Sequence, residues 1–433
     1  MTSHTLTDNQ KKALEILGSR ITGRLISHLN SCVRCGLCGE SCHYYLADPK
    51  PEYLPGYKIE QLGKVYRRYH TLPGRLAPSW VGARDLDDDM VQTLVDAFYG
   101  SCTMCNRCAL HCSIGVDIAY LIRTGRSMLA VMGLVPKGLQ STVDAALTTG
   151  NNMGIPREDL VDTLQWLEED LQMEVEDDKA AIPLDKKGAR VLYTLNPREP
   201  KFFPLSISAM AKIFYAAGED WTLSTHCYDV TNYAYFSGDT EGARELVDRL
   251  TQEAVKLEAQ TLALAECGHG YRAFRWEGPE YLQAAFPFEV VSVLELMAQY
   301  VATGRIQLDP SKNTKRVTLH DPCNLVRNGG VFEEQRFVLK HAVTDFVEMT
   351  PNRANNYCCG GGGGKLSMGE YKDRRIAAGR IKADQIRATG AKIVATPCHN
   401  CIDQLMELNQ HYQLGVEIKT VAELVADALV LEK

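Results

Sequence analysis

The sequence predicts an α+β protein in which a helical N-terminal domain precedes two similar α/β domains. Residues 7–29 repeat apolar side chains at helical spacing, and further helical segments follow in the first third of the chain. From residue 189 onward, short apolar runs alternate with amphipathic segments, which is typical of parallel strands joined by helices. This second part also repeats itself, because EVVSVLEL at 289–296 is echoed by EIKTVAEL at 417–424.

The domain boundaries follow from changes in the pattern of residue types along the chain. The charged stretch 174–188 contains Pro183 and Gly188 and separates the helical part from the α/β part. We expect domains at 1–175, 189–306 and 307–433. In the helical part the expected helices cover 7–29, 59–70, 87–99, 116–132 and 157–172. In the α/β part the expected strands cover 190–195, 222–224, 261–265, 317–320 and 393–396, and the expected helices cover 206–217, 240–259, 293–302, 332–342, 369–389, 400–411 and 421–430.

Composition and charge limit the possible functions. The chain has 433 residues, of which 45% are hydrophobic and 23% charged, and these values indicate a folded globular protein. The net charge of −7 argues against nucleic acid as a general partner. The sequence contains neither a basic-then-apolar leader nor an uncharged apolar run of about 18 residues. We therefore expect a cytoplasmic protein, soluble or peripherally attached to a membrane.

Two cysteine runs in the helical part share the spacing C-x2-C-x2-C-x3-C. In two-cluster ferredoxins with this spacing, the fourth cysteine of each run binds the other run's cluster. We therefore expect one [4Fe–4S] cluster on Cys32, Cys35, Cys38 and Cys112, and a second on Cys102, Cys105, Cys108 and Cys42. Proline usually follows the fourth cysteine, whereas this chain has His43 and Ser113, a departure that concerns the loops and not the ligands. Two zinc knuckles are the alternative interpretation.

Five further thiols come from three segments near the C-terminus, namely HDPC at 320–323, YCCGGGGGK at 357–365 and PCHNC at 397–401. The five cysteines are Cys323, Cys358, Cys359, Cys398 and Cys401. Structural zinc takes four ligands, and an adjacent cysteine pair fits one tetrahedral ion poorly. Five soft ligands favour an iron–sulfur cluster, and the glycine run lets the backbone pass close to it. A zinc site with spare thiols is the alternative.

This five-cysteine pattern resembles the CCG domain of heterodisulfide reductases. With two ferredoxin runs before it, the chain resembles the HdrD family of heterodisulfide reductases over essentially its whole length. DWTLSTHCYDVTNYAYFSGD at 220–239 and AECGHGYRAF at 265–274 are most similar to the DsrK and TmcB branch of membrane-bound redox complexes. The resemblance implies two [4Fe–4S] cubane clusters and one non-cubane [4Fe–4S] cluster, the last held by the five C-terminal cysteines.

The same resemblance implies an oxidoreductase subunit that faces the cytoplasm. It would be attached to the inner membrane through a cytochrome b-type subunit and other redox subunits. It would exchange electrons between quinone and a disulfide or thiol substrate, either a small molecule or a protein-borne group, at the non-cubane cluster. The substrate and the direction of electron flow stay open.

The first α/β copy has lost part of the cysteine pattern. Cys227 and Cys267 lie 131 residues before Cys358 and Cys398, but Tyr228 and Gly270 stand where the other two cysteines would be. We therefore expect one non-cubane cluster and not two. The two remaining thiols are either buried small side chains or groups that face the cluster. Three nearby side chains are candidates to supply protons or charge, or have a structural role: His269, Arg272 and His320.

Two other functions remain open at this stage. The chain could be the iron–sulfur subunit of a flavin-dependent dehydrogenase of the glycolate or glycerol-3-phosphate type, or a pure electron conduit without a substrate site. The glycine run before Lys365 is not a phosphate loop, because Leu366 stands where serine or threonine is needed. The apolar segment 129–139 either packs internally or docks on a partner.

Overall fold

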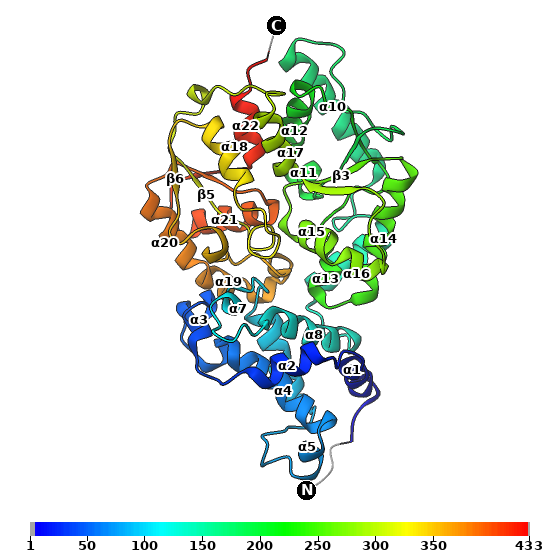
Figure 1. Cartoon of the computed structure of the whole chain (residues 1–433), viewed down its shortest axis with the longest axis vertical. Helices are drawn as coiled ribbons and strands as arrows, with labels where there is room; N and C mark the ends of the chain where they lie inside the picture. Colours follow the sequence, from blue (N-terminus) through cyan, green and yellow to red (C-terminus); the bar gives the residue numbers. More distant parts are fainter. Residues whose placement is uncertain (1–4, 432–433) are drawn as a thin grey trace. The chain divides into compact units, whose positions relative to one another are not determined.

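The computed structural model describes residues 5–431, which fold into two compact units (Figure 1). Unit 1 contains the chain up to Ser141 together with two later segments, Ala234–Thr240 and Gly360–Ile381. Unit 2 contains Thr142–Tyr233, Glu241–Cys359 and the chain from Lys382 onward. Each unit is therefore built from segments that are far apart in the sequence. In the described residues, none of the helices is long and apolar enough to cross a lipid bilayer.

Unit 1 is helical. Its helices are α1 (Asp8–Ser19), α2 (Gly23–Ser31), α3 (His43–Ala47), α4 (Pro55–His70), α5 (Leu72–Leu76), α6 (Asp88–Val95), α7 (Arg107–Leu110), α8 (Ile118–Val131) and α19 (Lys372–Ala378). The single helix expected over 7–29 is wrong, because the chain forms α1 and α2 instead. Thr22 causes the break, since its side chain accepts a hydrogen bond from the backbone N–H of Leu25 and starts a new helix.

Helix α8 is the centre of unit 1, where α1, α4 and α6 pack against it. The apolar segment that follows α8 contributes Leu129, Val135 and Leu139 to the interior. Burial of these three side chains agrees with internal packing of 129–139.

The close packing of α8 gives a testable prediction about stability. A Cβ atom on Gly125 would lie 2.0 Å from Cε2 of the buried Phe98 ring. Gly125→Ala should therefore lower the free energy of unfolding by about 1–3 kcal/mol, the usual cost of overpacking. Gly23→Ala in α2 is the matched control, because nothing lies within 4 Å of its Cβ position. Urea unfolding should show a neutral or slightly stabilising effect for the control, and equal losses in both variants would contradict the prediction.

Unit 2 contains two parallel sheets of four strands each within its described residues. The first sheet has the order β2-β1-β3-β4, and its strands are β1 (Val191–Tyr193), β2 (Trp221–Leu223), β3 (Thr261–Leu264) and β4 (Glu289–Ser292). The second has the order β6-β5-β7-β8, and its strands are β5 (Val317–Leu319), β6 (Phe346–Glu348), β7 (Ile393–Ala395) and β8 (Glu417–Lys419). The two sheets have the same topology, as expected for two copies of one domain.

Helices from the two copies pack on one another inside unit 2. The helices of unit 2 are α10 (Arg157–Val175), α11 (Arg198–Phe202), α12 (Pro204–Ala216), α15 (Gly268–Tyr271), α16 (Gly278–Leu282), α17 (Val293–Ala302), α18 (Glu334–Ala342), α21 (His399–Tyr412) and α22 (Val421–Ala428). Four further helices cross the unit boundaries: α9 (Lys137–Thr149), α13 (Tyr233–Ser237), α14 (Thr240–Lys256) and α20 (Arg380–Thr389). Helix α12 packs against α22, and α17 packs against α18, so one hydrophobic core serves both sheets. The α+β prediction is confirmed, although the helix expected over 369–389 is divided into α19 and α20 at Gly379.

Candidate metal centres

The two ferredoxin-type runs follow the same backbone path. In each run the residues two and four positions after the first cysteine have positive φ: 58° for Arg34 and 85° for Gly36, and 54° for Met104 and 62° for Asn106. Three of these four residues are not glycine, so the turns are costly to form. A short helical turn then carries the third cysteine in both runs. Two similar strained loops indicate a shared requirement to bring closely spaced thiols toward one point.

The first cysteine set lies around one cavity. Cys32, Cys35, Cys38 and Cys112 all line a space of about 230 Å³, so the fourth member comes from the second run. Three apolar side chains that line this space are also exposed to solvent: Val33 (69%), Leu37 (46%) and Ile114 (49%). This site is thus close to the surface, and its rim is apolar.

The second cysteine set lies around another cavity. Cys102, Cys105 and Cys108 line it together with Cys42 from the first run. Burial raises the pKa of the Cys42 thiol, and the nearby Lys58 ammonium acts in the opposite direction. Burial is also the main cause that raises the pKa of Cys108, followed by the neighbouring thiols. Crowded, desolvated thiols of this kind are better accommodated as metal-bound thiolates than as free groups.

The five C-terminal cysteines lie together in unit 2. Cys323 follows β5, and Cys398 is the N-cap of α21 after β7, so both follow the carboxyl ends of parallel strands. All five thiols are buried. The Sγ atoms of Cys323 and Cys358 are 4.0 Å apart, and those of Cys359 and Cys401 are 3.6 Å apart. These separations exceed a disulfide bond. The three cysteine sets together gather thirteen thiols at three places, and soft sulfur donors of this kind suit iron–sulfur clusters.

Thiol contacts already favour one thiolate in the C-terminal set. A hydrogen bond from Cys401 is the main cause that lowers the pKa of Cys398 well below its ordinary value, against the effect of burial, and a bond from the His269 side chain adds to it. The same contacts, with Cys359 and Cys398, raise the pKa of Cys401. A lowered pKa favours the thiolate form of Cys398, which is the form that binds metal.

Asp321 fixes the loop that carries Cys323. Its two carboxylate oxygens accept hydrogen bonds of 2.8 Å each from the guanidinium of Arg336 in α18, and both side chains are 1% exposed. The backbone N–H of Arg353 donates to Asp321 at 2.6 Å, which connects the same carboxylate to the segment before Cys358. Asp321 therefore holds two of the three cysteine-bearing segments in position.

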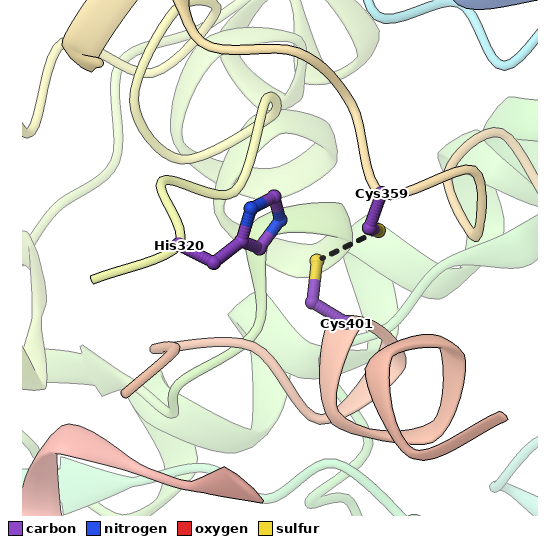
Figure 2. Close-up of side chains that lie close together, drawn as sticks. All are labelled: His320, Cys359 and Cys401. Carbon is purple, nitrogen blue, oxygen red and sulfur yellow. Dashed lines mark hydrogen bonds between the residues drawn. The ribbon is translucent and has the colours of Figure 1, made fainter. Parts of the chain in front are cut away.

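His320 points one ring nitrogen at the cysteine cluster (Figure 2). One of its ring nitrogens and the Sγ atoms of Cys359 and Cys401 all lie within 4.8 Å of one another. Its Nδ1 is 3.4 Å from Nδ2 of Asn356, whose Oδ1 accepts a 2.5 Å hydrogen bond from Nζ of Lys382. Because lysine only donates, the amide orientation is fixed, Nδ1 accepts and Nε2 carries the proton. This buried Nε2 has no hydrogen-bond partner among residues 5–431.

The protonation state of His320 follows from its surroundings. Burial, with a smaller contribution from the Lys382 charge, lowers the pKa of His320 to about 3. Burial likewise lowers the pKa of Lys382 to about 8. His320 is therefore a neutral N–H donor toward the thiols at neutral pH.

His269 is oriented in the same manner. Asn400, between the last two cysteines, approaches Nδ1 of His269 with Nδ2 at 2.7 Å, while its Oδ1 accepts a 2.8 Å hydrogen bond from the Tyr233 hydroxyl. The other side of His269 reaches Cys398. Tyr233 and Asn400 were not anticipated from the sequence, although Asn400 lies inside the PCHNC motif.

The remaining predicted residues lie beside the loop of Cys323 or in the first copy. Nη1 of Arg272 donates to Oδ1 of Asn324 at 3.2 Å, so it contacts the residue after Cys323. Cys267 is fully buried, and its Sγ accepts hydrogen bonds from the Gly270 N–H at 3.4 Å and from Asn196 at 3.6 Å. It is the N-cap of α15, as Cys398 is of α21. Burial is the main cause that raises the pKa of Cys227 to about 12.

Two family models match the chain. A "4Fe-4S dicluster domain" matches residues 28–116, and a "Cysteine-rich domain" named CCG matches residues 317–406. The first match covers all eight ferredoxin-type cysteines, and the second covers all five C-terminal cysteines. Iron–sulfur chemistry is therefore supported for both units.

Several curated relatives are similar over nearly the whole chain. The chain is 28% identical to the "Hdr-like menaquinol oxidoreductase iron-sulfur subunit 2" of Archaeoglobus fulgidus, over 93% of this chain and 80% of that protein. It is 29% identical to the D subunit of the "Dihydromethanophenazine:CoB--CoM heterodisulfide reductase" of Methanosarcina mazei, over 98% of this chain and 99% of that protein. It is also 25% identical to "EtfAB:quinone oxidoreductase" of Syntrophomonas wolfei, over 88% of this chain and 55% of that protein.

Proposed function

The chain is a CCG-domain iron–sulfur protein of the HdrD family of heterodisulfide reductases, and from this premise we propose that it exchanges electrons between a membrane-bound partner and a disulfide or thiol substrate. The relatives place it among oxidoreductase subunits. The observation that carries the substrate part of the proposal is the cluster of five buried cysteines beside two N–H-donating histidines, His269 and His320.

We assign three clusters to the three cysteine sets. Cys32, Cys35, Cys38 and Cys112 would hold one [4Fe–4S] cubane, and Cys102, Cys105, Cys108 and Cys42 the other, because each set lines its own cavity. Cys323, Cys358, Cys359, Cys398 and Cys401 would hold a non-cubane [4Fe–4S] cluster. A group of this kind supplies one-electron redox chemistry and an iron that a substrate sulfur can reach.

The chain's own residues have defined parts in this proposal. His320 lies beside Cys359 and Cys401 with an Nε2–H that no described residue accepts, and His269 donates toward Cys398, so both would stabilise negative charge on sulfur. Arg272 of the first copy donates to Asn324, the residue after Cys323, and so keeps the loop of Cys323 in place. Reduction of a disulfide needs two electrons and two protons. The membrane partner supplies the electrons, and solvent supplies the protons.

A membrane partner agrees with the relatives and with the rim of the first cavity. The Archaeoglobus relative is named a menaquinol oxidoreductase subunit. The exposed Val33, Leu37 and Ile114 would bring a partner subunit close to the first cysteine set. A cytochrome b-type subunit at the cytoplasmic face of the inner membrane, acting with further redox subunits, would fit this position.

The test of this function compares wild type with Cys359→Ala by electron paramagnetic resonance. The probes are dithiothreitol and a disulfide-linked pair of short cysteine peptides, added anaerobically to the oxidised protein. In wild type we expect a new signal with the dithiol and turnover of the peptide disulfide. In the variant both should be lost, while dithionite still reduces the two cubanes.

Two outcomes would count against this proposal. Turnover of the disulfide by Cys359→Ala would remove the chemistry from the five-cysteine site. No thiol-dependent signal in wild type with either probe would favour a pure electron conduit, or the iron–sulfur subunit of a flavin-dependent dehydrogenase. If the chain were isolated together with a flavoprotein instead of a cytochrome, the result would support a role as the iron–sulfur subunit of a flavin-dependent dehydrogenase.

A further inference from the structure

Three positively charged side chains are buried together in unit 1. Lys58 is 1% exposed, and Arg126 and Lys365 are 0% exposed. They come from α4, from α8 and from the segment after the glycine run, so three distant parts of the sequence supply them. Buried charges of this kind normally have a carboxylate partner.

The two lysines bind backbone oxygens in the loop that precedes Cys102. Nζ of Lys365 donates to the carbonyl oxygen of Gly100 at 2.7 Å, and Nζ of Lys58 donates to that of Ser101. Lys58 also lines the cavity of the second cysteine set. Both ammonium groups are therefore directed at the backbone that carries Cys102.

Arg126 binds the same loop from another direction. Its guanidinium donates to the carbonyl oxygen of Phe98 at 2.8 and 3.1 Å and to that of Cys102 at 2.9 Å. It also donates to the carbonyl oxygens of Phe236 at 2.5 Å and Gly363 at 2.8 Å. Every hydrogen bond that the described residues accept from these three cations is accepted by a neutral carbonyl oxygen, and none by a carboxylate.

Aromatic rings compensate the charges only in part. Nζ of Lys365 lies 4.4 Å from the ring centroid of Tyr371, and the guanidinium of Arg126 lies 4.8 Å from that of Tyr99. Such contacts offset only a part of the free energy that an uncompensated buried ion costs. A nearby anion is needed to balance three such charges.

The second cysteine set offers that anion. Four thiolates outweigh the positive charge of an iron–sulfur core, so the loaded site carries a net negative charge that grows by one on reduction. We propose that Lys58, Arg126 and Lys365 are the counter-charges of the cluster held by Cys42, Cys102, Cys105 and Cys108, and that they raise its reduction potential above that of the cluster at the first set. The inference rests on the proposed function only in assuming that this set binds a cluster.

The electrostatics of the two sites differ accordingly. Among the described residues lining the first cavity, the charged side chains are Arg34 and Glu60, which pair at 2.8 Å. Glu60 also pairs with Arg67 at 2.5 Å, so one carboxylate serves two guanidinium groups there, but the Arg34 side chain is 64% exposed and its charge is screened by solvent. At the second site burial, then Arg126, lowers the pKa of Lys365, and the Cys102 thiolate opposes this effect. Positive charge stabilises the reduced state of an anionic cluster. An electron from a partner or from dithionite should therefore reduce the second cluster in preference to the first.

The test is an anaerobic redox titration of both cubanes in the full, cluster-loaded chain, followed by electron paramagnetic resonance. Lys365→Met and Lys58→Met remove one charge each and keep most of the side-chain volume. In each variant one cubane should be reduced about tenfold less readily, a downward shift of about 59 mV for one electron, and the other should not move. Lys58→Arg, which keeps the charge, should behave like wild type. Lys12→Met, at an exposed position of the same unit, should change neither potential.

The other outcomes also decide the question. Unchanged potentials in both methionine variants, with the full iron content, would overturn the proposal. Loss of about four irons in Lys58→Met but not in Lys58→Arg would support it, because the charge would then be needed to hold the cluster. Equal iron loss in both Lys58 variants would show a packing role and overturn it. None of these readings uses a thiol signal, so they are independent of the substrate chemistry.

Discussion

Replacing Cys112 by serine is expected to remove the cluster bound by Cys32, Cys35 and Cys38, more than 70 residues earlier in the chain. The reason is that Cys112 lines the first cavity, although it belongs to the second cysteine run. Iron content after anaerobic isolation should fall from about 12 to about 8 atoms per chain, since each of the three proposed clusters would contain four irons. The resonance of one cubane should disappear, and electron exchange with the partner should fall with it.

Cys42→Ser is the reciprocal variant. It should remove the cluster of Cys102, Cys105 and Cys108 and leave the first cubane in place, because Cys42 lines the second cavity. The two variants should therefore lose different cubane signals. Should each substitution perturb the cluster of its own run instead, the crossed assignment would be wrong.

Replacing Arg336 by methionine is expected to lower the free energy of unfolding by about 3–5 kcal/mol, because Asp321 would keep a buried carboxylate without its partner. Arg336 also donates to Glu348 at 2.7 and 3.0 Å, so one guanidinium holds two acids. Since Asp321 precedes Cys323 by two residues, the C-terminal cluster should also be lost more readily. Anaerobic urea unfolding, followed by circular dichroism and by iron release, would measure both effects.

The matched control is Arg316→Met in the same copy. Arg316 and Asp345 also pair at 2.8 Å, but both side chains are nearly half exposed, so the loss should be below about 1 kcal/mol. Similar losses in the two variants would show that burial does not set the strength of the Arg336–Asp321 pair.

The sequence predicted the interior strands of both sheets and missed three of the four edge strands. Strands β4, β6 and β8 were not expected, although the repeated EVVSVLEL and EIKTVAEL segments contained two of them. Each is hydrogen-bonded on one side only, at a sheet edge, and has exposed or half-buried positions. An edge strand lacks the continuous apolar run that marks a buried parallel strand. The longer helices were recovered because their apolar period is clear, whereas the break at Thr22 depended on a single cap.

At the candidate sites, the sequence predicted three cysteine sets, and each of the first two lines one cavity. The sequence did not reveal the other side chains that support these sets. His269 and His320 were expected either to supply protons or charge or to have a structural role. The structure shows them fixed by Asn400 and Asn356, whose roles depend on contacts between distant segments. Lys365 follows a glycine run that resembles a phosphate loop but lacks its required residues. The residues around Lys365 in the sequence did not predict that its side chain is buried in unit 1. Long-range partners of this kind leave no periodic signal in the sequence.

The discontinuity of unit 1 has a consequence for biosynthesis. Ser141 closes its first segment, but its last segment ends at Ile381, 240 residues later. At roughly 5–20 residues per second, a ribosome would need roughly 10–50 s to deliver that remaining part. During this interval the eight ferredoxin-type thiols are already made, while Lys365 and the carbonyl of Gly363 that binds Arg126 are still missing. Stable insertion of iron should therefore wait until late in translation, and the nascent thiols would be exposed to oxidation until then.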